Sequence, residues 1–247
     1  MSGEVERRPE RPEGGKHFLS VTPVYEPYAY VAIAVDPEAK KLTYVTIEPV
    51  MLEEEKKLLD KIKEILLEEL DVDLKALEGR HKAEEYLKDA LRKVVKKYKL
   101  KVPEETLGKI TYYVIRDFVG FGKIDPMMRD HMVEDISCDG VGVPIYVWHR
   151  EYESLPSNVV FESAEELDSF VSRLAYRAGR HVSIAQPIVD AALPDGSRIN
   201  ITFSSEVSRK GSSFTIRKFR ADPLTITDLI TFKTCLLYTS PSPRDRG

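Results

Sequence analysis

Two arginines, Arg198 and Arg217, occur in short segments whose pattern suits a phosphate-binding surface. The first follows residues 194–196 (Pro-Asp-Gly), which predict a tight turn because Pro presets φ, Asp bonds its own backbone and Gly accepts positive φ. Apolar and polar residues alternate over 198–203 and again over 214–217, as in strands with one buried face. If the two strands pair in one sheet, both guanidinium groups share its polar face, where their planar forks suit phosphate oxygens.

Other basic residues near these strands are weaker candidates for contact with phosphate: Arg209, Lys210, Lys218 and Arg220. The alternative for the two strand arginines is that they pair with nearby acids such as Asp190 and Asp195, as ordinary surface residues do. We assign no catalytic residue and no metal ligand. His131, Glu134 and Asp135 lie close together in the sequence, but their spacing fits no zinc-binding pattern.

Charge is unevenly distributed along the chain. Residues 171–220 hold seven Arg and two Lys against three acidic residues, a net charge of +6, whereas the rest of the chain carries −10. This asymmetry indicates an anion-facing surface in an acidic protein. Arg173, Arg177 and Arg180 contribute to it at helical spacing, and for them a solvated helix face is an equally good interpretation.

The segments around the two arginines resemble the N-terminal domain of the ATPases that power type II and type IV secretion, type IV pili and the archaellum. Six segments carry the resemblance: residues 26–30, 44–49, 121–130, 133–136, 183–202 and 211–219. The most specific parts are residues 193–198 (LPDGSR) and 216–219 (IRKF), and the two earliest segments are similar to the archaeal branch. The resemblance extends over about residues 25–234.

This resemblance implies a ring-shaped homo-hexamer that binds ATP and Mg²⁺ between its N-terminal and motor domains. It implies that Arg198 and Arg217 reach the nucleotide phosphates. The implied partners are the protein's own P-loop domain, neighbouring subunits and a polytopic membrane platform protein, which receives the motion of the N-terminal domain. The implied location is cytoplasmic and peripheral, at the inner face of the membrane.

The sequence departs from the family at its C-terminal end. In the family a P-loop motor domain follows, but no Gly-x-x-x-x-Gly-Lys-Ser/Thr pattern occurs in these 247 residues. That loop supplies the backbone cradle for the phosphates, the Lys for the β and γ oxygens and the hydroxyl for Mg²⁺. We therefore interpret the chain as an N-terminal domain truncated before the motor, inactive as an ATPase alone and with no cofactor of its own assigned.

The sequence pattern around the arginines predicts an α+β fold. An N-terminal hairpin (28–35 and 42–47) and a small helical subdomain precede a mixed or antiparallel sheet with helices packed on it. In the later part, residues 134–138 and 145–148 predict two strands joined by a turn. Ser163 followed by Glu166 matches a capping box at the start of a helix. Three amphipathic stretches make up the helical subdomain: residues 58–70, 86–95 and 107–118.

We divide the chain into four parts: a disordered leader over 1–24, a β-hairpin with a helical subdomain over 25–119, an α+β nucleotide-facing core over 120–234 and a non-native tail over 235–247. The tail lacks helical or strand periodicity and resembles translated adapter sequence. A natural Ser/Pro-rich disordered tail is the alternative.

Composition excludes several classes of protein. The chain has no apolar stretch of about 18 residues, and its polar N-terminus is not typical of a signal peptide. The basic segment 171–220 leaves a nucleic-acid-binding or adaptor module as the alternative function. We expect no nucleic-acid partner, because exposed aromatic residues are not interleaved with the basic ones as in single-strand binders.

Overall fold

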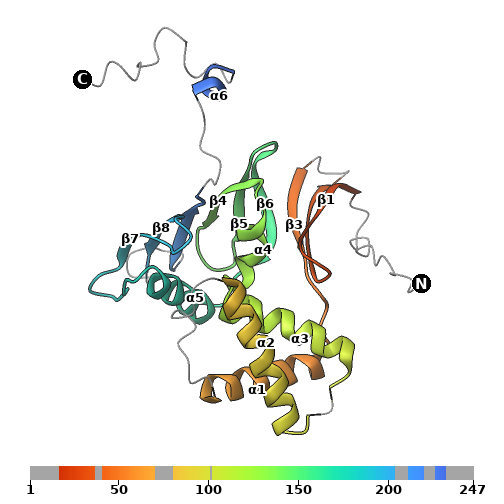
Figure 1. The fold of residues 1–247 in the computed structure, drawn as a ribbon. Coiled ribbons are helices and arrows are strands. Elements are labelled where there is room, and N and C mark those ends of the chain that lie inside the picture. Colours follow the sequence, from red (N-terminus) through yellow and green to blue (C-terminus); the bar gives the residue numbers. More distant parts are fainter. Residues whose placement is uncertain are drawn as a thin grey trace.

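The computed structural model describes residues 17–36, 41–69, 80–100, 102–203, 211–219 and 226–231. Its described strands form one nine-stranded sheet in the order β1-β2-β3-β6-β5-β4-β9-β8-β7, with helices packed on it and at one end (Figure 1). All neighbouring strands are antiparallel except β3 and β6. The α+β class with a mixed, mostly antiparallel sheet, predicted from the sequence, is confirmed.

The strands are β1 (His17–Tyr25), β2 (Ala29–Asp36), β3 (Lys41–Ile47), β4 (Val133–Cys138), β5 (Pro144–His149), β6 (Glu153–Val160), β7 (Ile188–Ala192), β8 (Arg198–Thr202) and β9 (Ser213–Arg217). The helices are α1 (Glu53–Glu69), α2 (Arg80–Lys97), α3 (Glu104–Phe118), the 3₁₀ turn η1 (Gly122–Ile124), α4 (Asp125–Arg129), α5 (Ala164–Arg177) and α6 (Ile226–Thr231). None of the described helices combines the length and the apolar character needed to cross a bilayer.

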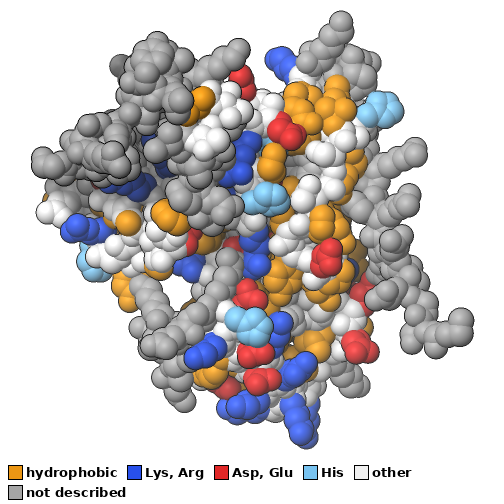
Figure 2. All heavy atoms as spheres, turned by 45° about the horizontal axis from the view of Figure 1, so that its top comes forward, with side chains coloured by type: hydrophobic (Ala, Val, Ile, Leu, Met, Phe, Trp, Pro, Cys, Tyr) orange, Lys and Arg blue, Asp and Glu red, His pale blue; other side chains and the backbone are white. Residues whose placement is uncertain are grey.

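The predicted N-terminal hairpin is present as β2 and β3, but the sheet begins earlier than expected. We predicted a disordered leader over residues 1–24, whereas β1 pairs with β2 from His17 onward. The strand signal was missed because β1 is an irregular edge strand. It contains register shifts and exposes Leu19 and Val21, so clean alternation of buried and exposed residues is lost. Hydrophobic side chains gather over this part of the sheet in Figure 2.

The hairpin joins the rest of the sheet through β3 and β6. These two parallel strands are in register at one residue pair, Tyr44 and Ser157. Beyond it, the Asn158 side chain replaces backbone pairing. Thr46 N donates to Asn158 Oδ1 at 2.8 Å, and Asn158 Nδ2 donates to Thr46 O at 3.0 Å. An amide side chain thus continues the ladder where the two backbones no longer meet.

Helices α1, α2 and α3 pack around a core of their own, as their apolar stripes predicted. Among its fully buried members are Ile62, Leu66, Leu87, Leu91 and Ile110. A partly buried ionic cluster connects this core to the end of β3. Arg116 Nη1 donates to both oxygens of Glu48, at 3.0 and 2.9 Å, and Arg116 Nε donates to Asp117 at 2.8 Å.

The corner between α3 and α4 is fixed by α5. The Arg177 guanidinium donates to the carbonyl oxygens of Val119 and Gly120 and lies 4.6 Å from the centre of the Phe121 ring. Arg177 is therefore an internal anchor and not part of a solvated helix face. The other two arginines of the stripe, Arg173 and Arg180, are exposed.

Helix α5 begins as the sequence predicted. Glu166 N donates to Ser163 Oγ at 3.2 Å, which confirms Ser163 as the N-cap. The helix packs on one face of the sheet, where the rings of Phe170 and Phe214 lie 5.3 Å apart. The opposite face of β4, β5, β8 and β9 carries the exposed side chains, and this open face holds the candidate site.

Candidate phosphate-binding site

Arg198 and Arg217 lie directly opposite each other. Strands β8 and β9 pair antiparallel, with Arg198 in register with Arg217 and Ile199 with Ile216. Both isoleucines are fully buried in the core to which α5 also contributes. Alternation therefore turns both arginines to the open face, where they are exposed. The structure therefore confirms that the two strands pair and that the arginines share a face.

The turn before β8 is built as its residues predicted. Gly196 has φ of +85°, a conformation that favours glycine, and its N–H donates to Leu193 O at 2.9 Å. The Asp195 carboxylate accepts from Ser197 N and from Ser197 Oγ, both at 3.0 Å. Asp195 therefore holds the turn, and the acid that pairs with Arg217 is Asp135, with Arg217 Nε 3.1 Å from Asp135 Oδ1.

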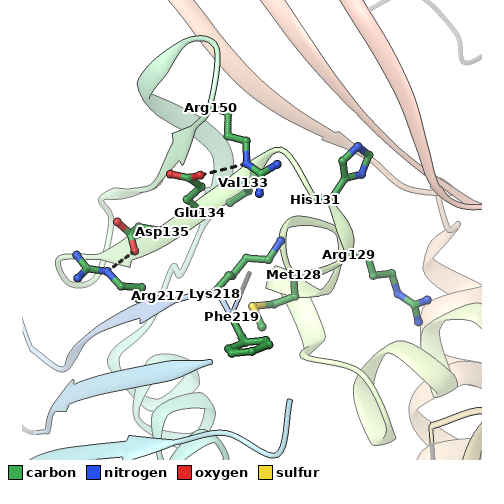
Figure 3. Close-up of a pocket in the computed structure, with 10 residues that line it drawn as sticks. All are labelled: Met128, Arg129, His131, Val133, Glu134, Asp135, Arg150, Arg217, Lys218 and Phe219. Carbon is green, nitrogen blue, oxygen red and sulfur yellow. Dashed lines mark hydrogen bonds and ion pairs between the residues drawn. The ribbon is translucent and has the colours of Figure 1, made fainter. Parts of the chain in front are cut away.

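Arg217 borders a hollow of about 600 Å³ where β4, β9 and the end of α4 meet (Figure 3). The lining residues are Met128, Arg129, His131, Val133, Glu134, Asp135, Arg150, Arg217, Lys218 and Phe219. The hollow thus contains one strong candidate, Arg217, and one weaker candidate, Lys218. Arg198 stands on the neighbouring strand, outside this lining.

Positive charge exceeds negative charge in the hollow. Arg150 Nε lies 3.1 Å from Glu134 Oε1, the same separation as between Arg217 and Asp135. Both pairs are open to solvent on at least one side, and such pairs contribute only about 0–1 kcal/mol each. Breaking either pair therefore costs little, and each guanidinium group can turn to another anion. Arg129, in contrast, is held by buried Asp125 at 2.6 Å.

Lys218 closes the inner side of the hollow. Its ammonium donates to Met127 O at 3.2 Å and to Asp130 O, and so binds carbonyls at the end of α4. Burial lowers the pKa of Lys218 to about 8, although the charge of Asp130 favours the protonated form. Lys218 therefore secures the end of β9 against α4, which fixes the base of the neighbouring Arg217.

Only some of the remaining candidate residues for phosphate or metal binding lie in the described part of the chain. Arg209, Lys210, Arg220 and the segment 235–247 lie outside the described residues. Three residues considered for a metal site, His131, Glu134 and Asp135, line the hollow. In the described part of the chain, no group of three or more His, Cys, Asp or Glu side chains is arranged to hold a metal ion.

Two residues that line the hollow, Arg150 and Phe219, were not singled out from the sequence. Phe219 had a usable signal, because it lies two residues after Arg217 and an extended backbone returns it to the same side. Arg150 had none, since it follows β5 and reaches the hollow only through the pairing of β5 with β4.

Fold and site together define a mixed-sheet α+β domain with an arginine-rich open face. The relatives are proteins of Methanocaldococcus jannaschii. The uncharacterized protein MJ1288 is 43% identical over 180 residues, which are 73% of this chain and 71% of that protein. The chain belongs to the same family as MJ1288.

Two longer relatives match in part. The uncharacterized protein MJ0900 is 45% identical over 136 residues, which are 55% of this chain and 24% of that protein. The uncharacterized protein MJ0781 is 34% identical over 145 residues, which are 58% of this chain and 19% of that protein. In both, the matched segment is a minor part of a longer polypeptide.

No protein-family model matches the chain. Among solved structures, the chain is similar to the VirB11 ATPase from the Brucella suis type IV secretion system in complex with sulphate. That similarity has a TM-score of 0.37 at 22% sequence identity and covers 44% of this chain and 32% of that one.

Proposed function

We propose that this chain is the N-terminal domain of a secretion, pilus or archaellum assembly ATPase, whose open sheet face contacts nucleotide held by a P-loop motor domain. The observation that carries the proposal is the direct opposition of Arg198 and Arg217. Like charges in directly opposed positions destabilise a sheet. An anion that bridges the two guanidinium groups removes this repulsion, and a phosphate fits both forks.

The packing beneath the arginines supports a domain that moves as a unit. Ile199, Ile201, Phe214 and Ile216 are buried under the two strands. Ser197 Oγ accepts from Phe219 N at 3.0 Å, so the turn before β8 is bonded to the end of β9. The guanidinium groups therefore stand on a stiff base, which suits a surface that must meet a nucleotide in a fixed position.

The sequence resemblance supplies the remaining parts of the proposal. The relevant ligand is ATP with Mg²⁺, bound in the assembled protein. The partners are the P-loop domain, the neighbouring subunits of a homo-hexamer and a polytopic membrane platform protein at the cytoplasmic face of the membrane. The match to minor parts of MJ0900 and MJ0781 supports a segment that works joined to other domains.

The test uses a protein in which this chain is joined to its motor domain. Replacing Arg198 or Arg217 with Lys keeps the charge but removes the planar fork. Each substitution is expected to reduce ATP turnover by at least about tenfold, equivalent to ~1.4 kcal/mol of transition-state stabilisation. The matched control is Arg173→Lys, an exposed arginine on α5, which should retain parental turnover. Parental turnover in both strand variants would contradict the proposal.

A further inference from the structure

Phe219 is an exposed aromatic residue at the edge of the arginine-rich hollow. Its side chain is 66% exposed, although phenylalanine is usually buried. It lies two residues after Arg217, and Lys218 N donates to Glu134 O at 2.8 Å, so the extended backbone continues past the end of β9. Phe219 and Lys218 both line the hollow, and Figure 3 shows their side chains extending in different directions from the backbone.

The turn before β8 supports this ring. A Cβ atom at Gly196 would lie 3.2 Å from Phe219 Cγ and 3.4 Å from Cδ2, so the ring packs against bare backbone. The bond from Phe219 N to Ser197 Oγ fixes the backbone at the same point. One side of the ring is therefore supported by the turn, and the rest of it is available for another flat group.

We propose that the hollow is a nucleotide-binding site in which the base stacks on Phe219 and the phosphates lie at Arg217 and Arg150. This inference rests on the proposed function and adds the part of the chain that receives the base. A volume of about 600 Å³ lies within the range of roughly 300–1,000 Å³ that small-molecule sites occupy. An aromatic ring beside arginines is the combination that binds bases and phosphates without reading base identity.

The arrangement of charge is consistent with this placement. Arg217 and Arg150 are paired with Asp135 and Glu134, respectively, through partly exposed contacts that a phosphate can replace. Lys218 adds positive charge from the inner side, next to the ring in the sequence.

The test is calorimetric titration of the full chain with ATP and with tripolyphosphate, both with Mg²⁺. ATP is expected to bind more tightly, because only ATP carries a base. Phe219→Ala should weaken ATP binding about tenfold and leave tripolyphosphate binding unchanged. Phe219→Trp should keep parental affinity for ATP. Arg217→Lys should weaken the binding of both ligands.

Two controls separate stacking from packing. Phe219→Leu keeps an apolar group over Gly196 but lacks the flat ring, so it should behave like Phe219→Ala. Trp148→Ala removes another exposed aromatic, 46% exposed, that is not part of the hollow, and should change neither affinity.

Several outcomes would overturn the inference: no ATP binding at millimolar concentration, equal affinity for the two ligands, or parental ATP affinity in Phe219→Leu. If tripolyphosphate still binds through Arg217 in those cases, the phosphate role stands and only the base site is lost. If Arg217→Lys binds both ligands like the parent while Phe219→Ala is weakened, the phosphate role and the proposed function fail instead.

Discussion

Arg217 has an opposite charge on one side and a like charge on the other. Asp135 is its register partner on β4, and Arg198 is its partner on β8. The three side chains form one row across the open face with a net charge of +1. Within this row the Asp135 carboxylate takes the place beside Arg217 that a phosphate oxygen would occupy.

Asp135→Asn is therefore expected to strengthen binding of tripolyphosphate to the chain by about two- to fivefold, the equivalent of one exposed ion pair of roughly 0.5–1 kcal/mol. Calorimetric titration measures the change. The matched control is Asp89→Asn, which removes an exposed acid paired with Arg92 on the remote helix α2. Weaker binding in Asp135→Asn would mean that this carboxylate orients Arg217 and does not compete with the ligand.

At the level of residues, the sequence predicted the arginine face but not the full site. The alternation of apolar and polar residues placed Arg198 and Arg217 on the polar face of two predicted strands. Their direct opposition depends on the register, which an alternating pattern does not specify. Asp135 lies on β4 and Arg150 follows β5, both far from β9 in the sequence. Only the pairing of β4 with β5 and β9 brings them to the hollow.

Among the elements, Arg177 links α5 to the residues that follow α3. Arg177 donates to two carbonyl oxygens at the end of α3, and its guanidinium lies over Phe121. Close packing continues at Gly120, where a Cβ atom would lie 2.5 Å from Asp125 Oδ1. Contacts with α5 and with the start of α4 therefore set the direction in which the chain leaves the helical subdomain.

Arg177→Met is expected to destabilise the protein, because the carbonyl groups of Val119 and Gly120 lose their hydrogen-bond donor. The expected loss in the free energy of unfolding is about 1–3 kcal/mol. A change of ~1 kcal/mol lowers the melting temperature of a domain of this size by roughly 2–4 °C. Thermal unfolding followed by circular dichroism measures it. Arg180→Met, at an exposed position just after the same helix, is the control. Equal melting temperatures for the two variants would show that Arg177 does not anchor the corner.

Element prediction succeeded where periodicity was strong. The three amphipathic helices and the β4–β5 hairpin follow from spacing and turn residues, and each is present. β6, which follows this hairpin, starts at Glu153 and contains Pro156. A proline inside a strand weakens the local signal, and pairing with β5 overrides it.

Over the whole molecule, one sheet connects the N-terminal hairpin to the arginine strands. The connection is narrow, because β3 and β6 share a single register pair and the Asn158 side chain supplies the adjoining hydrogen bonds. The β2–β3 hairpin and the strands β8 and β9 are therefore expected to unfold locally as separate units.

Asn158→Ala is expected to make the β2–β3 hairpin less stable than the rest of the sheet. The reason is that buried Thr46 loses the hydrogen-bond partners of its N–H and of its carbonyl oxygen. Native-state hydrogen exchange should show lower protection in β2 and β3, by about fivefold or more, with β8 and β9 unchanged. Asn200→Ala, at an exposed position on β8, is the control. Equal loss of protection in both parts would show that the sheet opens as one unit.

Asp130 connects parts of the sheet that do not touch. Its carboxylate accepts from Tyr44 Oη on β3 at 2.8 Å, and its backbone carbonyl accepts from Lys218 just after β9. Three strands, β6, β5 and β4, lie between β3 and β9. A single residue therefore links β3 to the end of β9. The hairpin cannot slide past β8 and β9 unless one of these two hydrogen bonds breaks.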